Sequence, residues 1–122
     1  MPQGRILFVD DDKDFLKVTG KVLAAEGYDV VTLSDGEEGI LRARTEKWDL
    51  VILDIVMPGL DGYRICERLK SGVETFSIPV LFLSGKKDAG DMLRGFFTGA
   101  HDYLVKPVTK ADLLKKVDHL IR

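Results

Sequence analysis

The chain reads LVILDIVMPGLDG over residues 50–62. Four apolar residues, Leu50–Leu53, stand directly before Asp54, and a Pro-Gly loop follows that carboxylate. A short apolar run without polar alternation is typical of a strand buried on both faces, as in a parallel sheet covered by helices. This stretch therefore predicts a central strand that ends at an acidic residue.

Other short apolar runs predict the remaining strands, and segments with helical periodicity separate them. The runs are Ile6–Val9, the weaker Val30–Leu33, Val80–Leu83 and Tyr103–Val105. Alternating strands and helices indicate an α/β, doubly wound fold with a five-stranded parallel sheet, for which we expect the strand order 2-1-3-4-5. Thr32 lies within the weaker run, which we expect at a sheet edge. Thr109 and Asp112 form a capping signature where the C-terminal helix should begin.

The length of 122 residues predicts one domain, covering residues 1–122. Hydrophobic residues make up 45% and charged residues 31%, the balance of an ordinary globular domain. A net charge of -2 gives no general attraction to nucleic acid or anionic lipid, so we expect neither as a direct partner. The apolar runs are too short to span a bilayer, and no apolar signal core is visible, so we expect a cytoplasmic protein. The lone Cys66 is expected to be buried in a helix.

Acidic residues follow two of the predicted strands. Asp10, Asp11 and Asp12 follow the first strand, and Asp54 follows the third. In the expected strand order these two ends meet where ligands collect in doubly wound folds. Converging carboxylates repel one another unless a cation lies among them, and oxygen ligands favour a hard ion such as Mg²⁺. Capping of the following helix is an alternative role, which we prefer for Asp12 alone.

Two further strand ends carry polar groups of a different kind. Ser84 follows Val80–Leu83, and Lys106 follows Tyr103–Val105. A hydroxyl and an ammonium group suit the oxygens of a transferring phosphoryl group. Either residue alone could be an ordinary surface residue, so the prediction rests on their joint placement with the carboxylates.

Four motifs in this order resemble the response regulator receiver family. They are Val9–Asp12, Leu53–Gly62, Leu83–Gly85 and Gly99–Pro107, and the resemblance covers nearly the whole chain. It implies a flavodoxin-like (βα)5 sandwich and a role in two-component signalling.

The resemblance also implies a role for each site residue. Asp54 would be the phosphoacceptor, taking the group from a sensor histidine kinase or a phosphotransfer protein. Asp11 and Asp54 would bind Mg²⁺ directly, Asp10 would act mainly through bound water, and the backbone carbonyl of Val56 would add a further oxygen. Such a chain would not be an enzyme in the ordinary sense, although it would assist its own phosphorylation and dephosphorylation.

The phosphoryl group itself would be held by Lys106 and Ser84, and the resemblance implies how its arrival is signalled. Ser84 would move toward the phosphoryl group and Tyr103 would turn inward behind it, changing the face formed by the fourth helix, the fifth strand and the fifth helix. That face would bind a downstream effector protein or a second copy of the chain. By the same analogy, the Lys106–Pro107 peptide bond is expected to be cis.

Several residues suggest features particular to this chain. Val56 has no hydrogen-bonding side chain, and with Lys86 it motivates the hypothesis that the lifetime of the phosphorylated state is altered. Glycines at positions 90, 95 and 99 weaken the predicted fourth helix. Phe97 departs from the apolar stripe of that helix and is a candidate for a partner surface.

Two other functions fit parts of the pattern. The Asp-x-Asp sequence beginning at Asp10 resembles that of haloacid-dehalogenase-like phosphatases, in which Asp10 would be the nucleophile of a Mg²⁺-dependent phosphohydrolase. The chain could also be a receiver-like interaction module without phosphate turnover. All of the expected polar positions are present, which argues against the second alternative.

Overall fold

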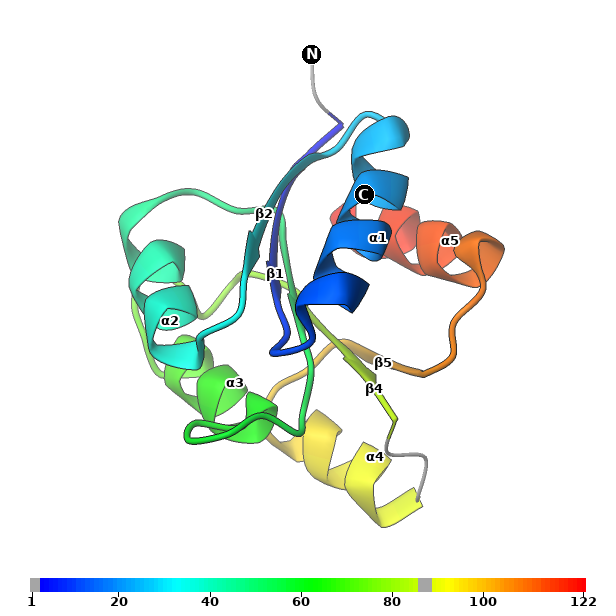
Figure 1. The fold of residues 1–122 in the computed structure, drawn as a ribbon. Helices are drawn as coiled ribbons and strands as arrows, with labels where there is room; N and C mark the ends of the chain where they lie inside the picture. The colour runs from blue at the N-terminus through cyan, green and yellow to red at the C-terminus, as the bar shows by residue number, and fades with distance from the viewer. Residues whose placement is uncertain (1–2, 86–88) are drawn as a thin grey trace.

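The computed structural model describes residues 3–85 and 89–122. Five strands alternate with five helices along this part of the chain (Figure 1). The elements, in chain order, are β1 (Arg5–Val9), α1 (Lys13–Ala25), β2 (Asp29–Leu33), α2 (Gly36–Thr45), β3 (Leu50–Leu53), α3 (Gly62–Lys70), β4 (Val80–Ser84), α4 (Ala89–Phe97), β5 (Asp102–Val105) and α5 (Lys110–Ile121).

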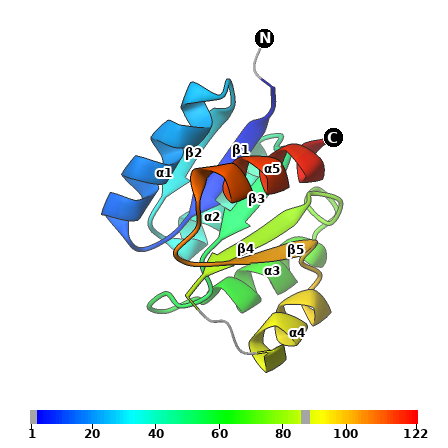
Figure 2. The same cartoon turned by 90° about the vertical axis from the view of Figure 1, so that its right-hand side faces the viewer.

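The five strands form one parallel sheet in the order β2-β1-β3-β4-β5, which confirms the predicted doubly wound fold. Four of the strands extend one residue beyond the predicted apolar runs, because backbone pairing continues through a polar residue at one end. Helices α1 and α5 cover one face, and α2, α3 and α4 cover the other (Figures 1 and 2). The weaker strand β2 lies at an edge, as its polar content predicted.

Side chains of the inner strands fill two apolar cores, one on each face of the sheet. In β1, Ile6 and Phe8 pack on the side of α1 and α5, whereas Leu7 and Val9 pack on the side of α2 and α3. All four residues of β3 are buried, as the run Leu50–Leu53 predicted. Full burial of one such aliphatic side chain contributes about 1.5–3 kcal/mol. The sheet is therefore held from both faces, and the ends of β1 and β3 have fixed positions.

Acidic or hydroxyl side chains mark four helix starts. Asp12, Asp35, Asp61 and Thr109 each accept a hydrogen bond from a backbone N–H of the first helical turn. The capping role preferred for Asp12 is thus confirmed, with Oδ1 at 3.1 Å from the amide nitrogen of Phe15.

Two smaller expectations also agree with the structure. Cys66 is buried in α3, and the Lys106–Pro107 peptide bond is cis. Among the helices described, none is long and apolar enough to cross a membrane.

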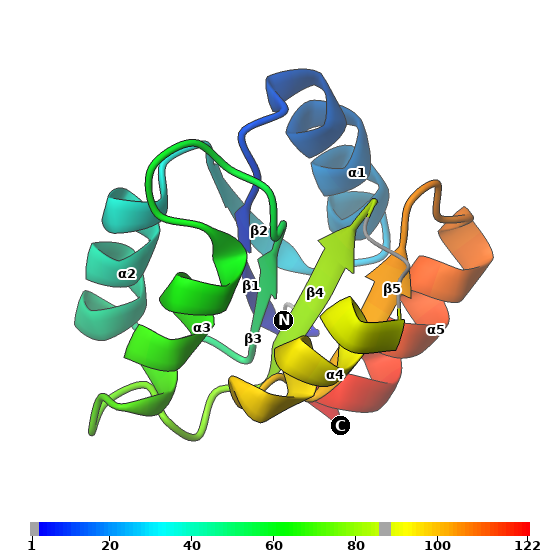
Figure 3. The same ribbon diagram turned by 90° about the horizontal axis from the view of Figure 1, so that it is seen from below.

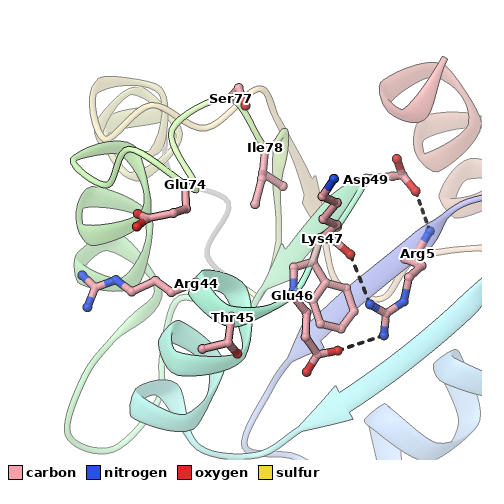
Figure 4. A pocket seen from close by; sticks show the side chains of 10 residues that line it. Arg5, Arg44, Thr45, Glu46, Lys47, Asp49, Glu74, Ser77 and Ile78 are labelled. Carbon is pink, nitrogen blue, oxygen red and sulfur yellow. Dashed lines mark hydrogen bonds and ion pairs between the residues drawn. The ribbon is translucent and has the colours of Figure 1, made fainter.

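Arg5, at the N-terminal end of β1, binds residues that lie just before β3. Its guanidinium donates to Glu46 at 3.1 Å and to the carbonyl of Lys47 at 3.2 Å, and it lies 4.3 Å from the ring centre of Trp48. Its backbone N–H donates to Asp49 at 2.8 Å. These groups border a hollow of about 690 Å³ (Figure 4). None of the described residues that line that hollow was predicted for the functional site.

Replacing Thr109 tests the cap of α5. The Thr109 hydroxyl accepts from the amide of Asp112 at 3.1 Å, and loss of such a cap costs about 1 kcal/mol. We expect Thr109→Ala to lower the free energy of unfolding by this amount in urea titrations. Thr109→Ser, which keeps the acceptor oxygen, should stay close to the parent protein; equal losses in both variants would contradict the capping role.

Candidate functional site

Asp10 and Asp54 stand side by side because their strands are neighbours. Val9 pairs with Leu53 in the register of β1 and β3, so the residues that follow each strand emerge together. The backbone N–H of Asp54 donates to the carbonyl of Val9 at 3.0 Å, and that of Asp10 donates to Leu33 at 3.1 Å. Both acidic residues are therefore placed by the sheet's own hydrogen bonding.

Three carboxylates gather at this edge of the sheet. Oxygens of Asp10, Asp11 and Asp54 lie within 4.8 Å of one another. Asp10 is fully buried and Asp54 is 7% exposed, whereas Asp11 is exposed to solvent. A donor set made only of oxygens, open on one side, has the chemistry that Mg²⁺ requires. The sequence prediction that these residues come together is confirmed.

Lys106 reaches the carboxylates from the end of β5. Its Nζ lies 2.8 Å from Asp10 Oδ2 and 4.0 Å from Asp54 Oδ2. The same ammonium lies 4.1 Å from the ring centre of Phe15, a contact between α1 and the β5–α5 connection. The cation thus has a defined position between α1 and the acidic edge of the sheet.

Ser84 completes the polar group from β4. Its side chain is fully buried at the last position of the strand, and its backbone carbonyl accepts from the N–H of Lys106 at 2.8 Å. Ser84 and Lys106 are therefore held next to each other by the continuing sheet.

The pKa of Asp54 reflects the charges that surround its carboxyl group. Burial raises the pKa of this carboxyl to about 6, and repulsion from Asp10 adds to the rise. Lys106, a hydrogen bond with Ser84 and the backbone N–H of Ile55 oppose the rise without cancelling it. Among the described residues, Lys106 therefore offsets only part of the effect of burial and of Asp10 on the pKa of Asp54.

The β3–α3 loop approaches the acceptor through a glycine. A Cβ added to Gly62 would lie 2.2 Å from the carbonyl oxygen of Asp54, and the Gly62 N–H donates to Ile55 at 2.9 Å. Only glycine allows this approach of α3 to the acidic edge. The sequence showed a glycine here but gave no sign of the close contact.

Val56 lies in the same loop, and its side chain is 57% exposed beside the site. It lines a hollow of about 250 Å³ together with Met57, Tyr63 and Arg94. Sequence reasoning did not single out Tyr63 or Arg94, because no motif or periodicity links residues so far apart in the chain.

Tyr103 and Phe97 lie outside the charged group. The Tyr103 ring is 6% exposed and packs edge-on against Phe82, with ring centres 6.1 Å apart. Phe97 is 81% exposed on α4, which leaves its ring available to a partner. The structure therefore brings together five of the predicted residues, Asp10, Asp11, Asp54, Ser84 and Lys106. Tyr103 is buried in β5 and Phe97 is exposed on α4, both outside this group.

Comparisons with known proteins agree with one another. The family described as response regulator receiver domain matches residues 6–118. The alkaline phosphatase synthesis transcriptional regulatory protein PhoP of Bacillus subtilis is 37% identical over 118 residues, which are 97% of this chain and 48% of that protein. The chain spans about half the length of the first curated relatives it matches.

Solved structures of receiver domains share the fold. The crystal structure of a candidate response regulator from Chloroflexus aurantiacus superposes with a TM-score of 0.93 at 33% identity, covering 99% of this chain and 98% of that one. The receiver domain of a sensor histidine kinase from Pseudomonas aeruginosa has a TM-score of 0.90 at 27% identity, with 97% of each chain covered. That structure has a magnesium ion coordinated in the active-site cleft.

Replacing Gly62 tests how closely α3 rests on the acidic edge. In Gly62→Ala the new methyl group meets backbone atoms of Asp54 and Ile55, which cannot rotate away, so we expect a loss of about 3 kcal/mol in unfolding free energy. Gly85→Ala is the matched control, because nothing lies within 4 Å of its added Cβ. Urea titration of both variants is the measurement, and similar midpoints would contradict the close contact.

Proposed function

This chain belongs to the response regulator receiver family, and we propose that it accepts a phosphoryl group on Asp54 from a phosphohistidine. The observation that carries the proposal is the meeting of Asp10, Asp11, Asp54, Ser84 and Lys106 at one edge of the sheet. The donor would be a sensor histidine kinase or a phosphotransfer protein of a two-component system.

Asp10, Asp11 and Asp54 would hold Mg²⁺ together with the backbone carbonyl of Val56. The fit rests on the carboxylate oxygens within 4.8 Å of one another and on the solvent-facing position of Asp11. When bound, the ion would offset negative charge on the carboxylates and on the transferring phosphoryl group.

In the transfer, a carboxylate oxygen of Asp54 forms a bond to phosphorus as the phosphorus–nitrogen bond of phosphohistidine breaks. The imidazole keeps the electron pair of that bond and leaves as the neutral base or, once protonated, as the cation. Lys106, 4.0 Å from Asp54 Oδ2, is placed to bind a phosphoryl oxygen as a point charge. The Ser84 hydroxyl, buried at the end of β4, would donate a hydrogen bond to another oxygen.

The output would be a change of surface rather than a product released from a cleft. Ser84 would move toward the phosphoryl group, and Tyr103, buried behind it, would couple this movement to the face formed by α4, β5 and α5. Phe97 supplies an exposed aromatic ring on that face. The bound partner would be a downstream effector protein or a second copy of the chain. The protein would thus be a phosphoacceptor that assists its own phosphorylation and dephosphorylation, without a separate substrate.

Asp10 is a poor candidate for the nucleophile of a phosphohydrolase. Its side chain is fully buried, and Oδ2 accepts from Lys106 at 2.8 Å while Oδ1 accepts from the N–H of Asp12 at 3.0 Å. Both oxygens are therefore engaged inside the protein.

Intact mass after incubation with acetyl phosphate and Mg²⁺ tests the proposal. We expect one added phosphoryl group, which Asp54→Asn abolishes because the attacking oxygen is lost. Asp12→Asn is the matched control, since Asp12 caps α1 and should not affect the covalent site. Peptide mapping of the adduct separates the two functions: an adduct on Asp10, or one that survives in Asp54→Asn, would contradict the receiver mechanism.

The lifetime of the phosphorylated state tests the role of Val56. Its exposed apolar side chain would disfavour a hydrolytic water beside Asp54, so we expect Val56→Asn to dephosphorylate several-fold faster. Val73→Asn, at a still more exposed valine in the α3–β4 connection, is the control. The decay of the phosphorylated mass is the measurement, and a Val56→Asn rate equal to the parent's would remove the idea. Lys86, linked to the same hypothesis, lies outside the described residues.

A further inference from the structure

Helix α4 rests on a row of three aromatic rings from three different elements. Tyr63 of α3 and Tyr103 of β5 both pack edge-on against Phe82 of β4, with ring centres 5.5 Å and 6.1 Å from it. Gly95 lets the α4 backbone approach this row, because a Cβ there would lie 3.0 Å from the Phe82 ring. Figure 3 shows α4 between α3 and α5, beside β4 and β5.

Arg94, the residue before Gly95, covers the end of this row. Its guanidinium carbon lies 4.3 Å from the ring centre of Tyr63, which is the geometry of a cation–π contact. Within the described part of the chain, Arg94 has no carboxylate within ion-pair distance. The contact with Tyr63 places the Arg94 guanidinium against α3.

Tyr63 is in turn tied to the acceptor. It follows Gly62, which lies against the carbonyl oxygen of Asp54 and donates its N–H to Ile55 at 2.9 Å. The Tyr63 ring is buried and cannot shift without moving its neighbours. An unbroken set of contacts thus runs from the backbone of Asp54 through α3 to Arg94 on α4.

Residues that follow the C-terminal end of α4 contact α3 in a different way. The Cys66 thiol donates to the carbonyl of Thr98 at 3.3 Å. Gly99 has a φ of +101°, and a Cβ there would lie 2.6 Å from Lys70. The Arg94–Tyr63 pair is a separate contact of α4 with α3, made at the start of α3 next to Gly62.

We propose that Arg94 is a positioning residue whose cation–π pair with Tyr63 couples the occupancy of the Asp54 site to the position of α4. This inference rests on the proposed phosphoacceptor function and adds a route separate from Ser84 and Tyr103. Near Arg94 on α4, the side chains of Leu93, Phe96 and Phe97 are 55%, 46% and 81% exposed. The coupling therefore acts on an apolar surface, and a partner bound there would alter the acceptor site by the same factor in return.

The experiment compares Arg94→Met, which keeps an apolar chain without the cation, with Arg94→Lys, which keeps a cation. Arg64→Met is the matched control, because Arg64 is an exposed α3 arginine whose side chain has no polar or ring partner among the described residues. Amide shifts of Ile55, Lys106, Gly95 and Phe97 are recorded by NMR before and after addition of Mg²⁺ and beryllofluoride as the phosphoryl mimic. Hydrogen exchange of the α4 amides is measured in the same samples.

In the parent chain and in Arg64→Met, we expect all four amides to shift when the site is loaded. In Arg94→Met, Ile55 and Lys106 should shift as before, while the shifts of Gly95 and Phe97 shrink and α4 exchanges about two- to five-fold faster. Arg94→Lys should recover part of both effects. Unchanged α4 shifts in Arg94→Met, or no α4 shift in the parent, would overturn the inference; absence of any shift at Ile55 and Lys106 would instead overturn the phosphoacceptor function.

Discussion

The placement of two buried carboxylates at adjacent strand ends is the constraint on which the rest of the structure depends. Asp10 and Asp54 belong to neighbouring strands, so the register of β1 with β3 forces them together at the edge of the sheet. Like charges in a buried site are costly unless cations balance them. Lys106 supplies one positive charge, and it reaches Asp10 only because β5 ends at the same edge. Four strands must therefore end in register for the site to exist.

The charge at that edge would suit the site to act as the switch proposed above. Among the described residues, Lys106 is the cation recorded beside the three carboxylates, and the pKa of Asp54 remains raised to about 6. A metal ion and a phosphoryl group would each change the local charge by more than the fixed residues can absorb without movement. Ser84, buried at the end of β4, would be placed to respond. Packed cores on both faces of the sheet would confine such a response to this edge and to α4.

The strands and the acidic cluster were predictable from sequence because both depend on local pattern and one topological rule. Leu50–Leu53 reads as a buried strand, and parallel strands place their carboxyl ends at one edge. Contacts between distant elements were not predictable in this way. The glycines of α4 suggested only a weak helix, whereas Gly95 is where the backbone meets Phe82. The contact of Arg94 with Tyr63 depends on how α4 packs against α3, and no sequence motif specifies that packing.

The contact of Arg5 with Trp48 has a consequence for fluorescence spectroscopy. Trp48 is the single tryptophan of the chain, and its indole is 7% exposed beneath the Arg5 guanidinium, at the end of the sheet opposite Asp54. Its indole N–H donates to the carbonyl of Arg42 at 2.9 Å, so the ring is fixed by polar as well as apolar contacts. Fluorescence excited selectively at Trp48 is therefore expected to report whether the domain is folded and to change little with events at the acidic edge. An optical signal for phosphorylation would need a second fluorophore, placed on α4.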